Sequence, residues 1–360
     1  MPRLAIPLIS IALIGYSVWG ISRVSAPVPA PQTQLAGDLA SPDRWCDLAD
    51  EYAEAGQDRE ARACFQRALQ LAPHIPQIWI RAANFHVMKS EPDQVLELTT
   101  RVLATVPDYD AVIFGYYDNL EIKPESVILS QWTSPRPALS YFDHLLATTQ
   151  LPAAQNAWNL LIKLGFADDA AAARLLSALI AHGQYETAFS EWTRYLGPRG
   201  GDYPRSNRLF NGGFENEPTG AAFDWSLTKH PAVEVSRDRG IHRTGASALR
   251  LGFQGTENVA YRHATQLAYL PPGRYLLRAA IRTEGITTNE GVHLHVTGNR
   301  LDLRSEPLNG THEWTRVELP FDVPGGTPLV AVSVCRDPSQ KFDNKIAGTA
   351  WVDDVSVVSR

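Results

Sequence analysis

The sequence predicts two folded regions, an α-helical one followed by a β-structured one, behind an apolar N-terminal segment. Apolar residues recur at helical spacing over residues 41–201, in a pattern that repeats every 34 residues. Period-two runs separated by Gly, Pro, Asn and Asp fill residues 205–360. No charge occurs between Arg3 and Arg23. A length of 360 residues suits about two domains of ordinary size.

Composition and charge exclude several classes of protein. A chain with 44% hydrophobic and 20% charged residues is neither disordered throughout nor collagen-like. The net charge of −6 leaves no strongly basic body, so nucleic acid is not expected as a partner. The charge is uneven: residues 26–201 hold 13 Lys or Arg against 21 Asp or Glu, whereas residues 202–360 hold 18 of each.

The N-terminal segment is predicted to engage a membrane. Leu4–Ser22 is a mostly apolar stretch of 19 residues, long enough to cross the hydrocarbon core of a bilayer. We therefore expect residues 1–25 to be an uncleaved anchor. The alternatives are a cleaved signal peptide, with a small-residue site at Val24-Ser25-Ala26, and a buried helix. Residues 26–40 follow as a Pro-rich linker, and the body of the chain is expected to be exported.

The first helix pair is the most regular part of the helical region. Trp45, Leu48 and Tyr52 fall on one stripe of a first helix, and a Gly56-Gln57-Asp58 turn precedes a second helix. The second helix and the residue that ends the unit contribute four further packing positions: Ala61, Phe65, Ala68 and Pro73. A shift of 34 residues maps Trp45 to Trp79, so a second repeat follows.

The later part of the region continues the pattern less regularly. A short pair is expected at Asp110–Leu120 and Pro124–Trp132, and Trp158 and Trp192 mark two further helices at the same 34-residue spacing. We therefore expect about five helix pairs stacked as a solenoid. The markers from Trp45 to Pro73 resemble the tetratricopeptide repeat. That resemblance implies a surface for a protein partner, and the alternative is a structural spacer.

The three cysteines are too few for a disulfide-stapled fold. Cys46 and Cys64 lie on the two helices of the first pair. They would pair in an oxidising compartment if their Cα atoms came within about 7 Å. Otherwise they are two partly buried thiols.

The C-terminal region is predicted to be an antiparallel β-sandwich, because about nine short strands alternate with turn signals. The expected strands are 208–215, 232–236, 247–253, 258–268, 274–283, 292–297, 314–321, 329–334 and 349–357.

Alternation along these strands predicts which side chains face away from the core. Val292, Leu294 and Val296 are expected inside, which turns the intervening histidines outward. The same argument indicates that one sheet carries six polar or aromatic side chains together: Gln266, Arg278, His293, His295, Trp314 and Arg316.

The two ends of this region carry a family resemblance. Asn211-Gly212-Gly213-Phe214-Glu215 opens it, and Asp353-Asp354-Val355-Ser356 closes it. With Gln266 and Pro272-Gly273-x-Tyr275 between them, these motifs resemble carbohydrate-binding modules of the galactose-binding-like fold, which are jelly rolls. The resemblance implies a structural calcium ion where the first and last strands meet, held by Glu215 with Asp353 or Asp354. Carboxylate oxygens suit that hard cation. The alternative is a turn cap and a solvated Asp pair.

The resemblance also implies glycan binding. Sugars are held by flat aromatic faces and by polar groups that hydrogen-bond to hydroxyls, and the six side chains named above supply both. The alternative is a solvated sheet face. Zinc binding is a further hypothesis, because the sequence has His263 and, on one strand, His293 and His295, whose rings lie on the same side. The spacing fixes no third ligand beside His293 and His295, however.

No catalytic motif is present, so an enzyme is not expected; the sequence lacks G-x-S-x-G, P-loop, G-x-G-x-x-G and H-E-x-x-H patterns. The leading hypothesis is a membrane-anchored scaffold of a bacterial inner membrane with its body in the periplasm. Its repeats would bind a protein and its sandwich a polysaccharide, in exopolysaccharide assembly or export. The alternatives are a secreted form, a purely structural interaction subunit without sugar binding, and a glycan-active hydrolase.

Overall fold

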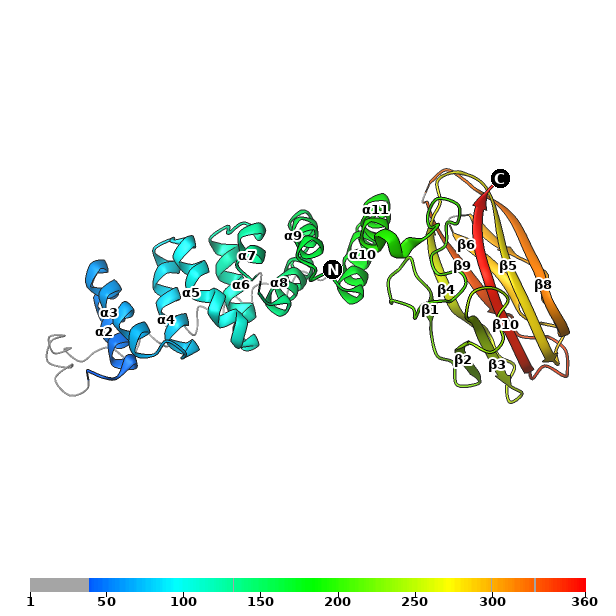
Figure 1. Cartoon of the computed structure of the whole chain (residues 1–360), viewed down its shortest axis with the longest axis horizontal. Coiled ribbons are helices and arrows are strands. Elements are labelled where there is room, and N and C mark those ends of the chain that lie inside the picture. Colours follow the sequence, from blue (N-terminus) through cyan, green and yellow to red (C-terminus); the bar gives the residue numbers. More distant parts are fainter. Residues whose placement is uncertain (1–38, 132, 299, 327) are drawn as a thin grey trace, which may run out of the picture. The chain divides into compact units, whose positions relative to one another are not determined.

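The computed structural model describes residues 39–360 apart from 132, 299 and 327, and it has helices followed by strands (Figure 1). The described residues form two compact units, one that ends at Ile122 and one that begins at Lys123. In the described part of the chain, no helix combines the length and apolarity needed to cross a membrane. The span predicted at Leu4–Ser22 lies outside the described residues.

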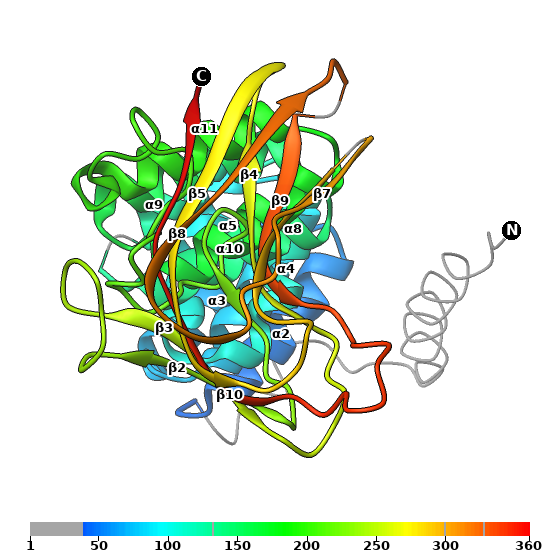
Figure 2. The ribbon, with the colours of Figure 1, turned by 90° about the vertical axis from the view of Figure 1, so that its right-hand side faces the viewer.

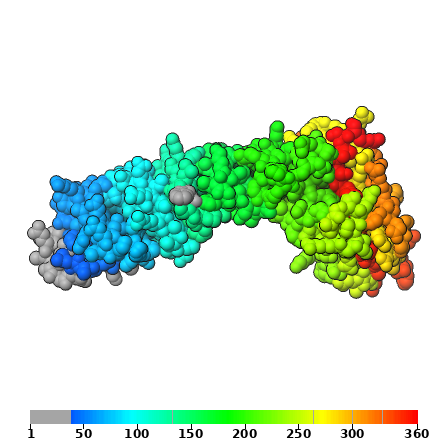
Figure 3. All heavy atoms as spheres, in the orientation of Figure 1, coloured from blue at the N-terminus to red at the C-terminus, as the bar shows by residue number. Residues whose placement is uncertain are grey.

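Ten α-helices follow one another in the described residues, in the repeat arrangement that the sequence predicts. They are α2 (Pro42–Glu54), α3 (Asp58–Leu71), α4 (Pro76–Met88), α5 (Pro92–Thr105), α6 (Asp110–Asn119), α7 (Pro124–Ser130), α8 (Pro135–Ala147), α9 (Leu151–Leu164), α10 (Asp169–Ala181) and α11 (Tyr185–Leu196). Short 3-10 turns lie at η3 (Pro107–Tyr109) and η4 (Gly197–Gly200). In the space-filling view, side-chain atoms cover the helices that Figure 1 draws as ribbons (Figure 3).

The first pair packs through the predicted stripe. Leu48, Ala61, Phe65 and Ala68 are buried in one cluster, and Trp45 and Tyr52 pack half-buried against it. Pro73 is exposed after α3 ends at Leu71. Ser41 caps α2 by accepting a hydrogen bond from the backbone N–H of Arg44. Gly56 joins the helices with φ +74°, which glycine adopts at low cost.

Two five-stranded antiparallel sheets form the C-terminal sandwich. The first has the order β1-β4-β9-β6-β7 and the second the order β2-β3-β10-β5-β8, which faces the viewer in Figure 2. The strands are β1 (Ser226–Leu227), β2 (Val233–Asp238), β3 (Ala248–Gln254), β4 (Tyr261–Tyr269), β5 (Gly273–Ile286), β6 (His293–Gly298), β7 (Leu301–Arg304), β8 (Gly310–Val323), β9 (Leu329–Arg336) and β10 (Ala347–Ser359).

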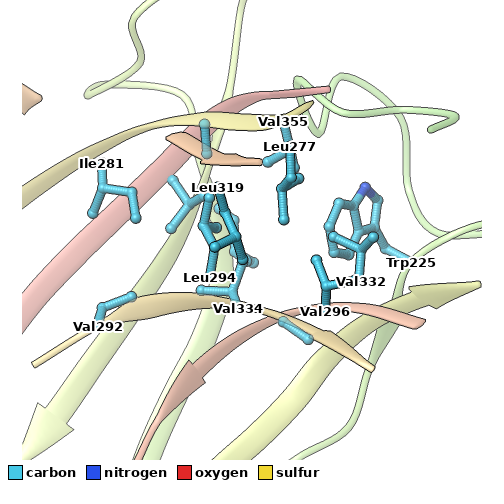
Figure 4. Packing of buried hydrophobic residues seen from close by; sticks show 14 of the residues in the cluster. Trp225, Leu277, Ile281, Val292, Leu294, Val296, Leu319, Val332, Val334 and Val355 are labelled. Carbon is cyan, nitrogen blue, oxygen red and sulfur yellow. The ribbon is translucent and has the colours of Figure 1, made fainter. Parts of the chain in front are cut away.

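The core lies between the two sheets. Val292, Leu294 and Val296 point inward, as predicted, and face Leu277 and Ile281 of the opposite sheet (Figure 4). A β-bulge in β10 between Asp353 and Ser356 shifts the alternation, so that both Val352 and Val355 reach the core.

One expected strand is wrong: residues 208–215 form successive turns. Asn211 and Phe214 have positive φ values of 54°, which an extended strand does not contain. The Asn211 side chain holds the turn by bonding both backbone groups of Asn216. The segment still lies along β10, because the N–H of Val355 donates to the carbonyl of Gly212 at 2.9 Å.

The last helix packs on the sandwich within the second unit. Phe189 of α11 stacks on Tyr269 of β4 with ring centroids 4.9 Å apart, and Trp192 meets Phe210 edge-on at 5.6 Å. The change from helix to strand therefore falls between Gly200 and Ser226, while the compact units divide at residue 122. The predicted domain boundary at 201–205 stays a prediction.

Candidate functional site

The six predicted glycan-binding side chains do not share one sheet face, so that expectation is wrong. Arg278 lies on β5, and Trp314 and Arg316 lie on β8, in the second sheet. His293 and His295 lie on β6, in the first sheet. Because strand pairing cannot be read from alternation alone, the sequence indicated that these five residues face outward but not from which sheet.

Gln266 is the one member that points inward. It pairs with Val332 across β4 and β9, and both residues are buried. Its Nε2 donates to the carbonyl of Phe210 at 2.9 Å. A bulge between Tyr261 and Ala264 shifts the alternation along β4, which explains the wrong face. Gln266 thus ties the turn segment to the first sheet.

On the outer face of the second sheet, charged side chains pair across β5 and β8. Arg278 Nε and Arg316 Nε both lie 3.1 Å from Glu318 Oε1. All three side chains are substantially exposed, at 36%, 58% and 42% respectively. Exposed pairs of this kind contribute little to stability and are ordinary for a solvated face.

A more closely built group lies on the outer face of the first sheet. We call it the Asp337 patch, and it consists of Arg262, His293, His295, Arg304 and Asp337. Asp337 follows β9 directly and accepts from Arg262 Nη2 at 2.9 Å and from Arg304 Nη1 at 2.6 Å. His293 Nε2 lies 3.6 Å from the same carboxylate. The two histidines are buried although they face outward.

Burial and hydrogen bonding set the charge states within the patch. Burial acts to raise the pKa of Asp337, but hydrogen bonds from Arg262 and Arg304 outweigh it and lower the pKa below its usual range. Burial lowers the pKa of His293, and the Asp337 charge offsets this only in part. At neutral pH the patch therefore holds an ionised carboxylate, two guanidinium groups and a neutral His293.

The sequence missed two members of this patch. Arg304 lies on β7, a four-residue strand that was not predicted, and Asp337 lies just beyond the predicted end of β9. A signal for both is hard to find, because their link joins residues 33 positions apart in the sequence. Among the predicted glycan-binding residues, His293 and His295 are the two that lie on this face.

The predicted calcium ligands lie together at the chain ends of the sandwich. Asp353 is fully buried and its Oδ2 accepts from the backbone N–H groups of Arg243 and Thr244, while Glu215 accepts from that of Ala246. Asp354 accepts a hydrogen bond from the Thr244 hydroxyl. All three carboxylates therefore surround the 243–246 loop.

Calcium fits this group in part. A Cβ built on Gly213 would lie 3.5 Å from Glu215 Oε1 and 3.6 Å from Asp353 Oδ1, so both oxygens approach one point. Among the described residues, however, no three His, Cys, Asp or Glu side chains are placed to hold a metal ion. A calcium ion would thus need backbone carbonyls or waters to complete its six to eight ligands. Burial raises the pKa of Asp353, which a cation would reverse.

Cys46, Cys64 and Cys335 are all free and buried. Cys46 and Cys64 are in the core of the first helix pair. Burial raises the pKa of Cys46 to about 11 and that of Cys335 to about 12, so neither is a reactive thiolate at neutral pH. The side chain of His263, the third histidine considered for zinc, lies outside the described residues.

The helical part of the first unit offers an apolar cavity of about 580 Å³. Pro73, Pro76, Trp79 and Val106 line it, and the Arg101 guanidinium lies 4.7 Å above the Trp79 ring. An aromatic wall with a cation above it suits an apolar side chain of a bound segment.

Comparison with known proteins identifies the first repeat. Residues 42–75 match the family model of the tetratricopeptide repeat. A comparison with curated proteins finds no match. The predicted combination of tetratricopeptide-type helices and a β-sandwich is thus confirmed by this match and by the observed helices and sheets.

Comparison with solved structures gives matches of low similarity. TmCBM61 in complex with β-1,4-galactotriose is 21% identical, with 43% of this chain and 99% of that one covered and a TM-score of 0.31. The xylan-binding CBM22-1 domain from Paenibacillus barcinonensis Xyn10C is 12% identical, with 41% and 91% covered and a TM-score of 0.27. YrrB, a TPR protein with an unusual peptide-binding site, is 12% identical, with 47% and 91% covered and a TM-score of 0.26. Likenesses this low transfer no binding residues.

Proposed function

We propose that the chain is a non-catalytic scaffold whose β-sandwich binds a glycan through the outer face of the first sheet. The Asp337 patch carries this proposal. It joins exposed arginines, a recessed carboxylate and two histidines, which are groups that hydrogen-bond to sugar hydroxyls. The second sheet carries three of the predicted residues, Arg278, Trp314 and Arg316, and its arginines form exposed ion pairs with Glu318.

Binding of polysaccharides to residues 39–360 tests the proposal. The helices belong in the protein tested, because removing α11 would uncover Tyr269 and Phe210. We expect a glycan to bind, and we expect Arg304→Gln to weaken binding while Arg316→Gln on the other sheet does not. A folded protein that binds no glycan would instead favour the purely structural interaction subunit. Sugar release without added enzyme would favour the hydrolase.

We further propose that the helical repeats bind a protein partner through the apolar cavity at Trp79. A photo-reactive amino acid in place of Arg101, which lies over that ring, is expected to crosslink one partner, whereas one in place of the exposed Glu97 on the same helix is not. Equal crosslinking from both positions would contradict the cavity as the binding site.

The cellular setting is also a proposal. We propose an N-terminal anchor in a bacterial inner membrane and a periplasmic body that acts in exopolysaccharide assembly or export. Fractionation of cells that produce the full chain tests the location: residues 1–25 should retain the protein in the membrane fraction. Release into the medium would indicate the secreted form.

A structural calcium ion is proposed at Glu215 and Asp353. Calcium should raise the melting temperature of residues 39–360, and Glu215→Gln should remove that effect. Gly213→Ala is a second probe. Its Cβ would lie 3.5 Å from Glu215 Oε1 and 3.6 Å from Asp353 Oδ1, close to both carboxylates and without a steric clash. No shift at saturating calcium would contradict the site.

A further inference from the structure

The Asp337 patch positions two arginines that come from distant strands. The sheet order is β4-β9-β6-β7, so Arg262 on β4 and Arg304 on β7 start three strand spacings apart, or about 14 Å. Both side chains nevertheless reach Asp337, one to each carboxylate oxygen. Two guanidinium groups of like charge are thus held close together over one face of the sheet.

The exposures show which groups meet a ligand first. The Arg262 and Arg304 side chains are 59% and 63% exposed, whereas that of Asp337 is 14% exposed. Asp337 therefore orients the arginines from below and leaves them at the surface.

Asp302 is the acidic group that opposes this charge. It lies on β7, is 86% exposed, and pairs with His295 Nε2 at 2.7 Å. Counted with the two arginines, Asp302 leaves a formal charge of +1 on the exposed groups, and the recessed Asp337 brings the whole group to zero.

We infer that this patch binds acidic glycans, through the carboxylate of a uronic acid residue. A planar carboxylate matches the fork of an arginine and takes two parallel hydrogen bonds from it. The hydroxyls of the same sugar ring would meet the remaining polar groups of the patch. This inference rests on the proposed glycan binding and adds the class of glycan.

The second sheet supplies a matched control. Arg278 and Arg316 share Glu318 just as Arg262 and Arg304 share Asp337, but their carboxylate is 42% exposed and not recessed. Each sheet face therefore carries two arginines that share one carboxylate, but only on the first sheet is that carboxylate recessed beneath the arginines. Substitution of one pair at a time separates the patch from general surface charge.

The test compares acidic with neutral polymers, and one pair of ligands, polygalacturonate and its methyl ester, shares a backbone and differs in the charge of its carboxyl groups. Residues 39–360 are titrated with polygalacturonate, with its fully methyl-esterified form, with alginate and with neutral β-1,4-galactan. We expect an acidic polymer to bind best, and esterification or high salt to weaken binding. Arg262→Gln and Arg304→Gln should each reduce affinity about tenfold or more, while Arg278→Gln and Arg316→Gln leave it unchanged. Melting temperatures confirm that each variant is folded.

Each of the other outcomes contradicts a specific part of the inference. Binding that favours neutral galactan or the esterified polymer overturns the acidic class and leaves the proposed glycan binding in place. Binding of an acidic polymer that is lost only in Arg278→Gln or Arg316→Gln overturns the site. A folded protein that binds none of the four polymers overturns the inference and removes the support for glycan binding as well.

Discussion

At the scale of single residues, Arg336 stands out as a charged side chain in the interior of the sandwich. Its side chain is fully buried, and burial lowers the pKa of the guanidinium. It donates to the Glu290 carbonyl at 3.2 Å, the Asn258 side chain at 2.8 Å and the Asn344 carbonyl at 3.2 Å, and so ties three loops together. A buried charge is tolerated only when it is this fully hydrogen-bonded.

Replacing Arg336 by Met should therefore destabilise the sandwich strongly. Loss of the guanidinium leaves several buried acceptors unsatisfied, at a cost of about 3 kcal/mol or more. Chemical unfolding monitored by tryptophan fluorescence measures the change. Arg316→Met, at an exposed position, is the control and should change stability by less than about 0.5 kcal/mol. Equal effects of the two substitutions would contradict the structural role of Arg336.

Glu91 provides a pH-dependent test in the helical part. The Arg62 guanidinium donates to both of its carboxylate oxygens, His86 adds a further bond, and together they lower the pKa of Glu91 to about 2. Because the folded pKa lies below the unfolded value, Glu91 stabilises the fold above pH 4.5 and loses this contribution as the pH falls toward 2.

Between pH 4.5 and 2, the wild-type protein should therefore lose more stability than Glu91→Gln does. Urea unfolding at a series of pH values, followed by helical circular dichroism, measures the difference. Glu97→Gln on α5, the helix that Glu91 directly precedes, is the control and should follow the wild type. Parallel curves for wild type and Glu91→Gln would contradict the contribution of the Arg62–Glu91 pair.

At the scale of elements, α11 belongs to the sandwich as much as to the helices. Phe189 stacks on Tyr269 and also meets the rings of Phe223 and Tyr203 edge-on at 6.1 and 6.2 Å. These contacts cover part of β4 and fix the last helix to the first sheet.

Phe189→Ala should loosen α11 from the sheet, because it removes several aromatic contacts, at a cost of about 2–3 kcal/mol. Hydrogen exchange of backbone amides should then speed up in α11 and in β4, while exchange in α2 and α3 stays unchanged. Exchange that rises equally in every helix, or in none, would contradict a specific contact between α11 and the sandwich.

Elements differed in how well the sequence predicted them. The helix pairs were predictable because Trp45, Leu48 and Phe65 lie at the spacing of packed helices, and each pair depends on local contacts. The turn segment at 208–215 was not, because it contains positive-φ residues and its backbone bonds to β10 through Gly212 and Val355, which are more than 140 residues apart. Pro73 follows the end of α3, as the sequence predicted, but its side chain is exposed and does not pack in the core.

At the scale of the whole molecule, the candidate site was only partly predictable for the same reason. Alternation showed that His293, His295, Arg278 and Arg316 face outward, which local geometry decides. Whether they lie together depends on strand order, which places β6 in the first sheet and both β5 and β8 in the second. The patch that resulted includes Arg304 and Asp337, whose roles depend on a contact that no local pattern encodes.

The central claim is that a glycan binds the outer face of the first sheet. Hydrogen–deuterium exchange of residues 39–360, with and without a bound acidic polysaccharide, tests it most directly. We predict that protection appears in β4, β6 and β7 and in the residues after β9 that contain Asp337, with β5 and β8 unchanged. Protection confined to β5 and β8 would contradict the assignment.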